Sequence, residues 1–383
     1  MTTQAFRNAD VLVDGQLEPV DVVVTDGRIV DVADRPGRVG PGDVDLDGLV
    51  LAPGFIDLQC NGAVGVDITS EPHRLAEVAL ALPRFGVTAF LPTVVTSPPT
   101  QRAGALDAIR AARTTPDPGA AVPLGLHLEG PALSPQRLGA HPPQFVVGAA
   151  DLDAEVDEWI RSGEVTLVTL APELDGAPAL VARLAAAGIV VAAGHTTMST
   201  AEFAAAKAVG LRYVTHLFNA MAGFDHREPG PIGAALADDD VVVGLICDGV
   251  HVDPIAVAMA WKALGPSRTS LVSDAVAALG EPFGRLRLGA IEVIHDEHGV
   301  RTLDGVLAGS ALALDQAVRN LMAFTGCSLA DAVGTVTSVP AGLLGLADRG
   351  RIAVGARADF TVLDHDAGLV ATIAAGAVAH GQL

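Results

Sequence analysis

Short apolar segments alternate with helix-forming segments through the middle of the chain, and this alternation limits the fold more than any other feature. The eight strand candidates read GFIDLQ, GVTAFLPTV, PLGLHLE, VTLVTLAPE, GIVVAAGH, RYVTH, VVVGLICD and TSLVSDA. Between most of them lie alanine-rich segments with helical spacing, such as EPHRLAEVALALPRFG and TAEFAAAKAVG. These repeats predict an α/β fold, a (β/α)₈ TIM barrel over residues 53–339, which helices near 310–325 and 328–338 would close.

The two ends of the chain differ from this middle region. Near the N-terminus, VVVTDGRIVDV places an Asp-Gly turn between β-branched runs, which predicts a hairpin. Near the C-terminus, RIAVGARADFTVLD and LVATIAAGAVAHG have the same strand-rich character. We therefore expect residues 1–52 and 340–383 to form one small β-sandwich domain together.

The chain carries a formal net charge of −21, which argues against partners that need a basic surface. A nucleic-acid backbone requires clustered Lys and Arg, so no nucleic-acid partner is expected. No apolar run reaches the roughly 18 residues that span a bilayer, and the start, MTTQAFRNAD, lacks the order of a signal peptide. Three cysteines give no disulfide framework. These features predict a cytoplasmic protein without a membrane partner, in which an anionic ligand needs local positive groups.

Polar side chains follow the predicted strands at the points where they end. They are Gln59, Asn61, Glu129, His195, His216, Asp248 and Asp274. In a (β/α)₈ barrel the C-terminal strand ends meet at one rim, and buried charges there must be paired or bound to a metal. Each residue alone has a structural alternative, such as helix capping by Glu129 or an ion pair between Asp274 and an arginine. Two imidazoles and a carboxylate at one rim suit a divalent metal, because a catalytic zinc has three protein ligands and an open position for water.

Eight short motifs, spread over nearly the whole chain, resemble those of one enzyme family. They are PGFIDLQCNG (53–62), GLHLEGP (125–131), GHT (194–196), THLFNAM (215–221), REPG (227–230), DGVHVD (248–253), LVSDA (271–275) and LAGSAL (307–312). PGFID and the closing pattern GxxxxGxxADFTVLD (350–364) are typical of the amidohydrolase superfamily, whereas HLEGP, THLFNAM and REPG are more specific. The chain resembles the N-acetylglucosamine-6-phosphate deacetylases of that superfamily.

This resemblance implies a metal-dependent hydrolase that converts N-acetyl-D-glucosamine 6-phosphate to D-glucosamine 6-phosphate and acetate, in amino-sugar catabolism or cell-wall recycling. It implies one divalent ion per subunit, bound by Glu129, His195 and His216. Such a set of ligands suits Zn²⁺ first, although Fe²⁺, Co²⁺ and Mn²⁺ also bind it.

The first predicted strand departs from a pattern that many members of the superfamily share. Those members hold two ions with a His-x-His pair and often a carboxylated lysine, whereas here Gln59 and Asn61 stand in place of the histidines. The chain has only two lysines, Lys207 and Lys262, and both fall in predicted helices, so no lysine bridge is expected. Neutral amides are weak ligands for such metals. We therefore expect one ion, with a second and weaker ion at Gln59 and Asn61 as the alternative.

The other expected site residues have catalytic or substrate-binding roles. Asp274 is expected to take a proton from the attacking water and give it to the leaving amine, and His141 to help stabilise the oxyanion. The resemblance implies that Arg227 reaches the phosphate in the neighbouring site of a homodimer, while a surface ion pair with Glu228 or Asp225 is the alternative. The expected substrate-binding residues are Ala140, His141, Asn219, Ala220, Arg227, His251, Leu307, Ala308 and Gly309.

Two other functions stay open on the sequence alone. One is a different amidohydrolase, such as an N-acyl-amino-acid or cyclic-imide hydrolase, although these usually use the His-x-His pair and often the bridging lysine. The other is a catalytically inactive scaffold, because a decayed enzyme could lose its first-strand histidines in this way. The loop near 274–285, with the sequence AVAALGEPFG, is expected to be either a lid over the site or an ordinary connection.

Overall fold

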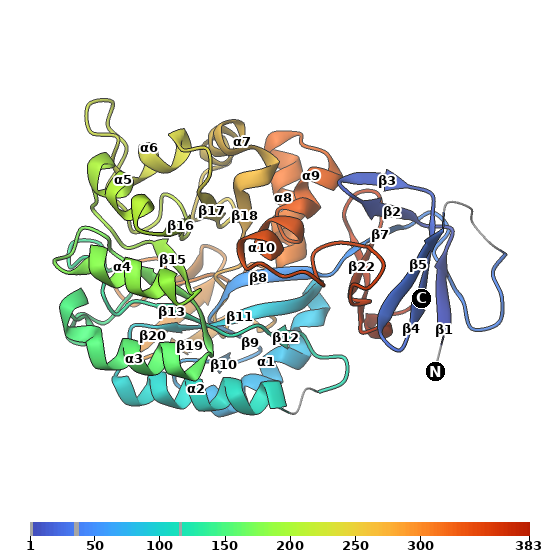
Figure 1. Cartoon of the computed structure of the whole chain (residues 1–383), viewed down its shortest axis with the longest axis horizontal. Coiled ribbons are helices and arrows are strands. Elements are labelled where there is room, and N and C mark those ends of the chain that lie inside the picture. The colour runs from blue at the N-terminus through green and yellow to red at the C-terminus, as the bar shows by residue number, and fades with distance from the viewer. Residues whose placement is uncertain (1–2, 34–37, 115–116) are drawn as a thin grey trace.

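The computed structural model describes residues 3–33, 38–114 and 117–383, which form a large barrel region and a smaller region of sheets (Figure 1). The barrel and its helices enclose one hydrophobic core, which includes Phe55, Phe90 and Trp159. The smaller region encloses a second core, which includes Phe6 and Phe360. The two regions therefore each bury apolar surface of their own.

Eight parallel strands form the barrel, and they coincide with the eight strand candidates of the sequence. They are β8 (Phe55–Cys60), β11 (Val87–Val95), β13 (Leu126–Glu129), β14 (Val165–Leu170), β15 (Val190–Ala193), β16 (Leu211–Val214), β17 (Val242–Leu245) and β18 (Thr269–Leu271). Every residue of β8 and β11 is buried, as expected for parallel strands that are covered on both faces. The predicted (β/α)₈ fold is confirmed.

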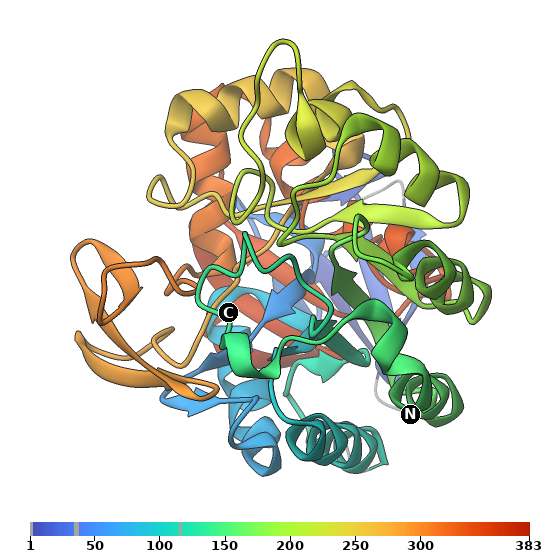
Figure 2. The same ribbon diagram turned by 90° about the vertical axis from the view of Figure 1, so that its left-hand side faces the viewer.

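Helices surround these strands, as the view onto one end of the barrel shows (Figure 2). They are α1 (Leu75–Ala81), α2 (Pro99–Thr114), α3 (Asp153–Ser162), α4 (Ala177–Ala186), α5 (Thr200–Ala208), α6 (Gly230–Ala237), α7 (Pro254–Arg268), α8 (Leu314–Thr325), α9 (Leu329–Gly334) and α10 (Ser338–Leu343). The helix predicted near 328–338 is in fact two short helices, because residues 335–337 leave the helical path to reach the barrel strands.

The last strand of the barrel does not pair directly with the first. No strand ladder joins β18 to β8 within the described residues. The segment 335–336 lies between them instead: Ile56 N donates to Val336 O at 2.7 Å, and Leu271 N donates to Thr335 O at 3.2 Å. Residues 335 and 336 therefore fill one part of the junction between β8 and β18. We call the whole junction the seam.

The other part of the seam is formed by direct backbone hydrogen bonds at and beyond the C-terminal ends of the two strands. Asp274 N donates to Gln59 O at 2.9 Å, and Asn61 N donates to Ala275 O at 2.7 Å. Closing the ring of strands thus brings the end of the first strand against the segment that follows the last one.

The smaller region is built from both termini. One sheet has the order β5-β4-β1-β6, from β1 (Thr3–Arg7), β4 (Asp21–Thr25), β5 (Arg28–Ala33) and β6 (Val44–Asp45). The other has the order β24-β23-β22-β7-β2-β3, from β2 (Asp10–Val13), β3 (Gln16–Glu18), β7 (Val50–Pro53), β22 (Phe360–Leu363), β23 (Leu369–Ala374) and β24 (Ala377–Gly381). The predicted Asp26-Gly27 hairpin joins β4 to β5. The exact domain boundaries stay a prediction.

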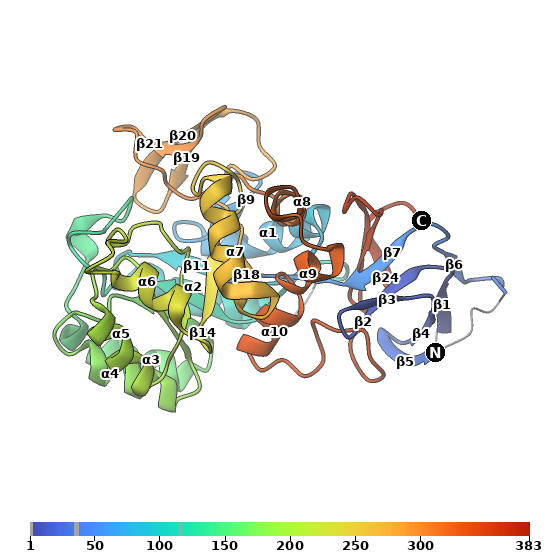
Figure 3. The same cartoon turned by 90° about the horizontal axis from the view of Figure 1, so that it is seen from above.

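A three-stranded antiparallel sheet that the sequence analysis did not predict follows the last barrel strand. It consists of β19 (Gly284–Leu288), β20 (Ile291–Asp296) and β21 (Gly299–Thr302), and it projects from the barrel (Figure 3). The remaining strands are the short β9 (Gly62–Ala63), β10 (Val66–Asp67) and β12 (Val122–Pro123). Within the described residues, no helix is long and apolar enough to cross a membrane.

Candidate active site

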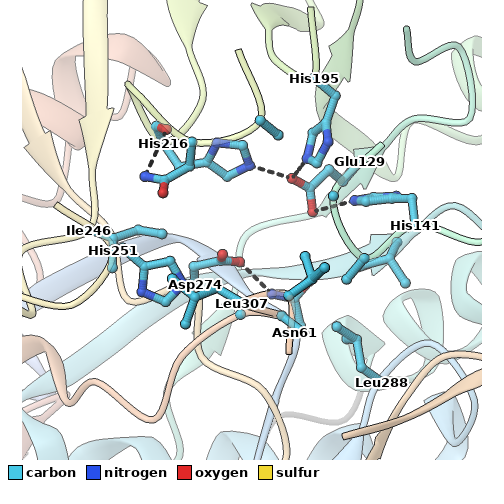
Figure 4. Close-up of a pocket in the computed structure, with 18 of the residues that line it drawn as sticks. Asn61, Glu129, His141, His195, His216, Ile246, His251, Asp274, Leu288 and Leu307 are labelled. Carbon is cyan, nitrogen blue, oxygen red and sulfur yellow. Dashed lines mark hydrogen bonds and ion pairs between the residues drawn. The ribbon is translucent and has the colours of Figure 1, made fainter. Parts of the chain in front are cut away.

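Glu129 ends β13 and lies at the centre of a cluster of three histidines (Figure 4). Its Oε1 is 3.2 Å from His195 Nε2 and 2.9 Å from His216 Nε2. Its Oε2 is 3.7 Å from His141 Nε2. All four side chains are buried. The structure therefore brings the three expected metal ligands together, with His141 beside them.

The glycine after Glu129 has a steric reason in this structure. Gly130 has φ +86°, and a Cβ added to it would lie 2.3 Å from Thr96 Oγ1. Thr96 Oγ1 donates to the carbonyl oxygen of Glu129 at 3.2 Å. A side chain at position 130 would break this contact, so the Glu-Gly pair of the HLEGP motif holds the carboxylate in place.

The hydrogen bonds of the ring nitrogens separate the roles of two histidines. His195 Nδ1 is 2.9 Å from Arg137 O, so it must donate, and the lone pair of Nε2 is left free to bind a metal. His141 Nδ1 accepts from Thr96 N at 3.3 Å, so its Nε2 carries the proton and donates. Distance alone would admit His141 as a ligand, because the ligand atoms of Glu129, His141 and His195 lie within 4.8 Å of one another. The protonation pattern makes it a donor instead.

Three of the expected metal-binding and catalytic residues have a left-handed backbone. The φ angles are +50° at His195, +30° at His216 and +49° at Asp274. Non-glycine residues in this region are strained by roughly 1–3 kcal/mol each, and such strain is concentrated at functional sites. At the ends of these strands it turns the side chains into the barrel mouth.

Burial and mutual contact set the charges in the cluster. Burial opposes the charge of Glu129, but its close contacts with His141, His195 and His216 lower the pKa of this carboxyl well below its usual range. Burial lowers the pKa of His195 to about 4. A carboxylate beside a neutral imidazole at neutral pH is the protonation state that a divalent cation requires of its ligands.

The two amides at the end of β8 act as hydrogen-bond donors. Gln59 Nε2 donates to Glu129 Oε1 at 3.1 Å and to Asp274 Oδ1 at 3.0 Å. Asn61 Nδ2 donates to Asp274 Oδ1 at 2.7 Å. Their buried side-chain oxygens have no hydrogen-bond partner in the part of the chain that the structure describes. The amides therefore connect the two carboxylates.

Asp274 faces the histidine cluster from the opposite wall of the pocket (Figure 4). Burial raises the pKa of its carboxyl to about 6, and the negative charge of Glu129 adds to the shift. Burial and the neighbouring carboxylate thus bring the pKa of Asp274 closer to neutral pH, where a carboxyl can both accept and return a proton.

The pocket brings together most of the predicted substrate-binding residues. Those that line it are Ala140, His141, Asn219, Ala220, His251, Leu307, Ala308 and Gly309, together with Asn61, whereas Gln59 does not line it. Arg227 is absent from the lining, and its side chain is exposed. In the described part of the chain the Arg227 guanidinium forms no ion pair with Asp225 or Glu228, so the surface-pair alternative is not realised.

Residues 50–379 match the model of the amidohydrolase family, which is most of the chain. The chain belongs to the amidohydrolase family. This agrees with the parallel barrel and with the motifs that indicated the superfamily.

Three relatives indicate which kind of amidohydrolase this chain is similar to. N-acetylglucosamine-6-phosphate deacetylase of Danio rerio is 37% identical over 379 residues, which cover 94% of this chain and 92% of the relative. N-acetylgalactosamine-6-phosphate deacetylase of Escherichia coli O157:H7 is 37% identical, covering 92% of each. A Mycobacterium smegmatis N-acetyl-D-glucosamine-6-phosphate deacetylase mutant, solved in complex with N-acetyl-D-glucosamine-6-phosphate, is 34% identical with a TM-score of 0.91 and covers 99% of this chain and all of that one. The resemblance inferred from the motifs is confirmed.

Asp248, the remaining strand-end carboxylate, orients a second polar group of this amidohydrolase. Its Oδ2 is 2.7 Å from His251 Nδ1, and its Oδ1 accepts from the backbone N of Val250 and His251 at 2.8 Å each. His251 must therefore donate through Nδ1, which leaves its other ring nitrogen for the pocket.

The sequence analysis missed the apolar wall of the pocket. Val95, Ile246, Leu288 and Val306 line it. Val95 and Ile246 end or follow barrel strands, where an apolar residue cannot be told from ordinary core. Leu288 belongs to the unpredicted sheet β19–β21. The alternation in LRL and IEVIHD on either side of Gly289–Ala290, followed by the turn DEHG, was the signal that could have located this sheet.

A buried carboxyl that the reaction does not need lies below the site of this amidohydrolase. Asp57, on β8, accepts from the hydroxyl and backbone N of Ser273 and from the backbone N of Gln59. Burial raises the pKa of Asp57 from 3.8 to about 6. Between these values the folded state keeps a proton that the unfolded state has lost, so this group's contribution to stability is present below pH 3.8 and is lost as the pH rises through about 6.

We expect Asp57→Asn to remove this dependence. Relative to the wild type, its free energy of unfolding should rise by about 2 kcal/mol between pH 4 and pH 7, because each pK unit of the shift is worth roughly 1.4 kcal/mol and part of the difference has already developed at pH 4. The substitution fits, because the Ser273 hydroxyl can turn toward Gln59 O, 3.1 Å away, and accept from the new amide. Urea unfolding of both proteins with a chelator present measures the difference. A difference that stays constant with pH would show that Asp57 is not protonated in the folded state.

Proposed function

We propose that this amidohydrolase hydrolyses the acetamide of N-acetyl-D-glucosamine 6-phosphate, giving D-glucosamine 6-phosphate and acetate. The observation that carries the proposal is the buried arrangement of Glu129 with His195 and His216 on one oxygen, faced across the pocket by Asp274. The names of the relatives supply the substrate, and the M. smegmatis structure contains it.

One divalent ion on Glu129, His195 and His216 is the cofactor we propose, with Zn²⁺ first and Fe²⁺, Co²⁺ or Mn²⁺ as other ions that suit the ligands. Such an ion lowers the pKa of a water molecule and polarises a carbonyl. The amide donors of Gln59 and Asn61 support a single ion, because they direct N–H groups at the carboxylate oxygens that a second cation would need.

The chain's own residues then account for the proton transfers. Asp274 takes the proton of the attacking water and gives it to the leaving nitrogen, as its raised pKa allows. His141 Nε2–H donates to the acetamide oxygen while negative charge develops there. The apolar wall of Val95 and Leu288 keeps bulk water away from this part of the pocket.

The substrate phosphate is negatively charged, and the pocket of a single subunit does not compensate this charge. No lysine or arginine lines the pocket among the described residues, while Glu129 and Asp274 add negative charge. We propose that Arg227 of a neighbouring subunit supplies the cation in a homodimer, beside His251 and the Asn219–Ala220 segment. The exposure of Arg227, and the absence of an ion-pair partner for it among the described residues, support this role. The three cysteines are free, which supports the cytoplasmic location expected from the sequence.

Arg227→Ala should lower kcat/KM for the phosphorylated sugar by about 10- to 100-fold, the value of a charge-assisted hydrogen bond. Unphosphorylated N-acetylglucosamine should lose almost nothing. Arg212→Ala is the matched control, because Arg212 is exposed at the opposite end of the barrel on β16. Equal losses on both sugars would contradict the phosphate role.

Mixed dimers test whether the site is shared. Arg227→Ala and Asp274→Asn subunits, unfolded together and refolded as a mixture, should regain about a quarter of wild-type activity, since half of the dimers are mixed and one of their two sites is intact. A mixture no more active than its components would place Arg227 in its own subunit's site.

The function itself is tested by acetate release with and without a chelator. The substrates are the 6-phosphates of N-acetylglucosamine and N-acetylgalactosamine, plus an N-acetyl amino acid. We expect chelator-sensitive hydrolysis of N-acetylglucosamine 6-phosphate. Preference for the galactosamine derivative would change the assigned sugar, and preference for the amino acid would replace the proposal. A protein that binds no metal and remains inactive after metal is added would be the scaffold.

A further inference from the structure

One carboxylate near the site has no part in the reaction but holds the backbone beside a proposed metal ligand. Glu173 lies in the loop after β14. Its Oε1 accepts from Thr197 N at 2.6 Å and from Thr197 Oγ1 at 3.1 Å, and its Oε2 accepts from Thr196 Oγ1 at 2.5 Å. It thus ties the loop of one barrel strand to the loop of the next, directly after His195.

Thr196 is also joined to the predicted substrate-binding segment. Its N donates to Ala220 O at 3.2 Å, and its O accepts from Ala222 N at 3.0 Å. His195 and Ala220, on either side of this junction, both have a left-handed backbone, with φ of +50° and +51°. A strained backbone keeps such a geometry only while its surroundings enforce it.

We infer that Glu173 is a positioning residue, which fixes His195 for the metal and the Asn219–Ala220 segment for the sugar phosphate. This inference rests on the proposed function, since that function assigns the two groups. The carboxylate acts through Thr196 and Thr197, because it satisfies two hydroxyls and one backbone N–H that would otherwise compete for other partners. Without it, His195 and Ala220 can relax together toward ordinary backbone angles.

The chain provides a matched control for this role. Glu202 accepts in the same way from the N and Oγ of Ser199, in the capping box at the start of α5. This carboxylate is only six residues from Thr196 but supports a helix end and does not contact the pocket. A Glu202 variant therefore loses the same kinds of hydrogen bond without affecting the metal ligands.

The experiment measures the zinc dissociation constant by chelator competition, and KM and kcat for N-acetylglucosamine 6-phosphate, in the full-length protein. Glu173→Ala should weaken zinc binding about 10- to 100-fold, the range found when support of a metal ligand is lost. KM should rise with it. Glu173→Gln should recover most of both, because its oxygen can accept from Thr197 N while its nitrogen donates to Thr196 Oγ1. Glu202→Ala should lower only the melting temperature.

Zinc affinity of Glu173→Ala within about twofold of the wild type would overturn the inference, as would an equal loss in Glu202→Ala. Failure of the proposed function would look different. In that case the wild type itself would bind no zinc or would not release acetate, whereas failure of the inference leaves the wild type intact and the Glu173 variant indistinguishable from it.

Discussion

Asp274→Asn should reduce turnover by about 10²- to 10⁴-fold, the contribution of a well-placed general acid–base group. The amide has the same shape, and its oxygen can still accept from Gln59 Nε2 and Asn61 Nδ2. It cannot take a proton from water or return one to the amine. Metal content and KM should therefore stay near the wild-type values, as measured by metal analysis and steady-state acetate release.

The control for this variant is Asp57→Asn, which neutralises another buried carboxyl of the barrel without changing the pocket lining. It should keep most of the turnover. Near-wild-type turnover in Asp274→Asn would exclude the acid–base role and would leave the raised pKa of Asp274 as a consequence of burial alone.

His195→Ala should abolish most activity by removing the metal. A direct ligand is worth more than the roughly 10- to 100-fold in affinity that its supporting contacts contribute, so zinc should be lost during purification. Excess zinc in the assay should restore only a small part of the activity. Metal content per subunit, measured in protein purified without added ions, decides the outcome.

His251→Ala separates ligands from other pocket histidines. Its ring lines the same pocket but bonds to Asp248, away from Glu129, so this variant should keep its zinc and raise KM. If His195→Ala retained full zinc, the assignment of ligands would be wrong, and His141 would have to replace His195 despite its donor tautomer.

The architecture of the barrel could be read from the sequence because each strand combines two local signals. An apolar run predicts a strand buried on both faces, and the polar residue that ends the run marks the rim. Glu129, His195, His216 and Asp274 were found in this way, and the structure places them around one pocket. The topology does the rest, since parallel strands bring their C-terminal ends to the same side.

Other features depend on contacts between distant segments and had no local signal. The protonation of His141 follows from Thr96, which lies 45 residues away in the chain. The donor role of Gln59 becomes visible only when Glu129 and Asp274 lie beside it. The sheet β19–β21 was overlooked because its short strands resemble a loop when no partner strand is known.

The seam between β8 and β18 makes the order of synthesis matter for this protein. Until the ribosome has released the stretch around Val336, Ile56 and Leu271 have no backbone partner across that gap. A nascent chain that already contains every proposed catalytic residue still lacks the segment 335–336. This segment completes the seam in which Asp274 lies beside Gln59. The protein should therefore become active abruptly and late in synthesis, once about the final tenth of the polypeptide has emerged. Heating that loosens the segment 335–336 should inactivate the enzyme before the rest of the barrel unfolds.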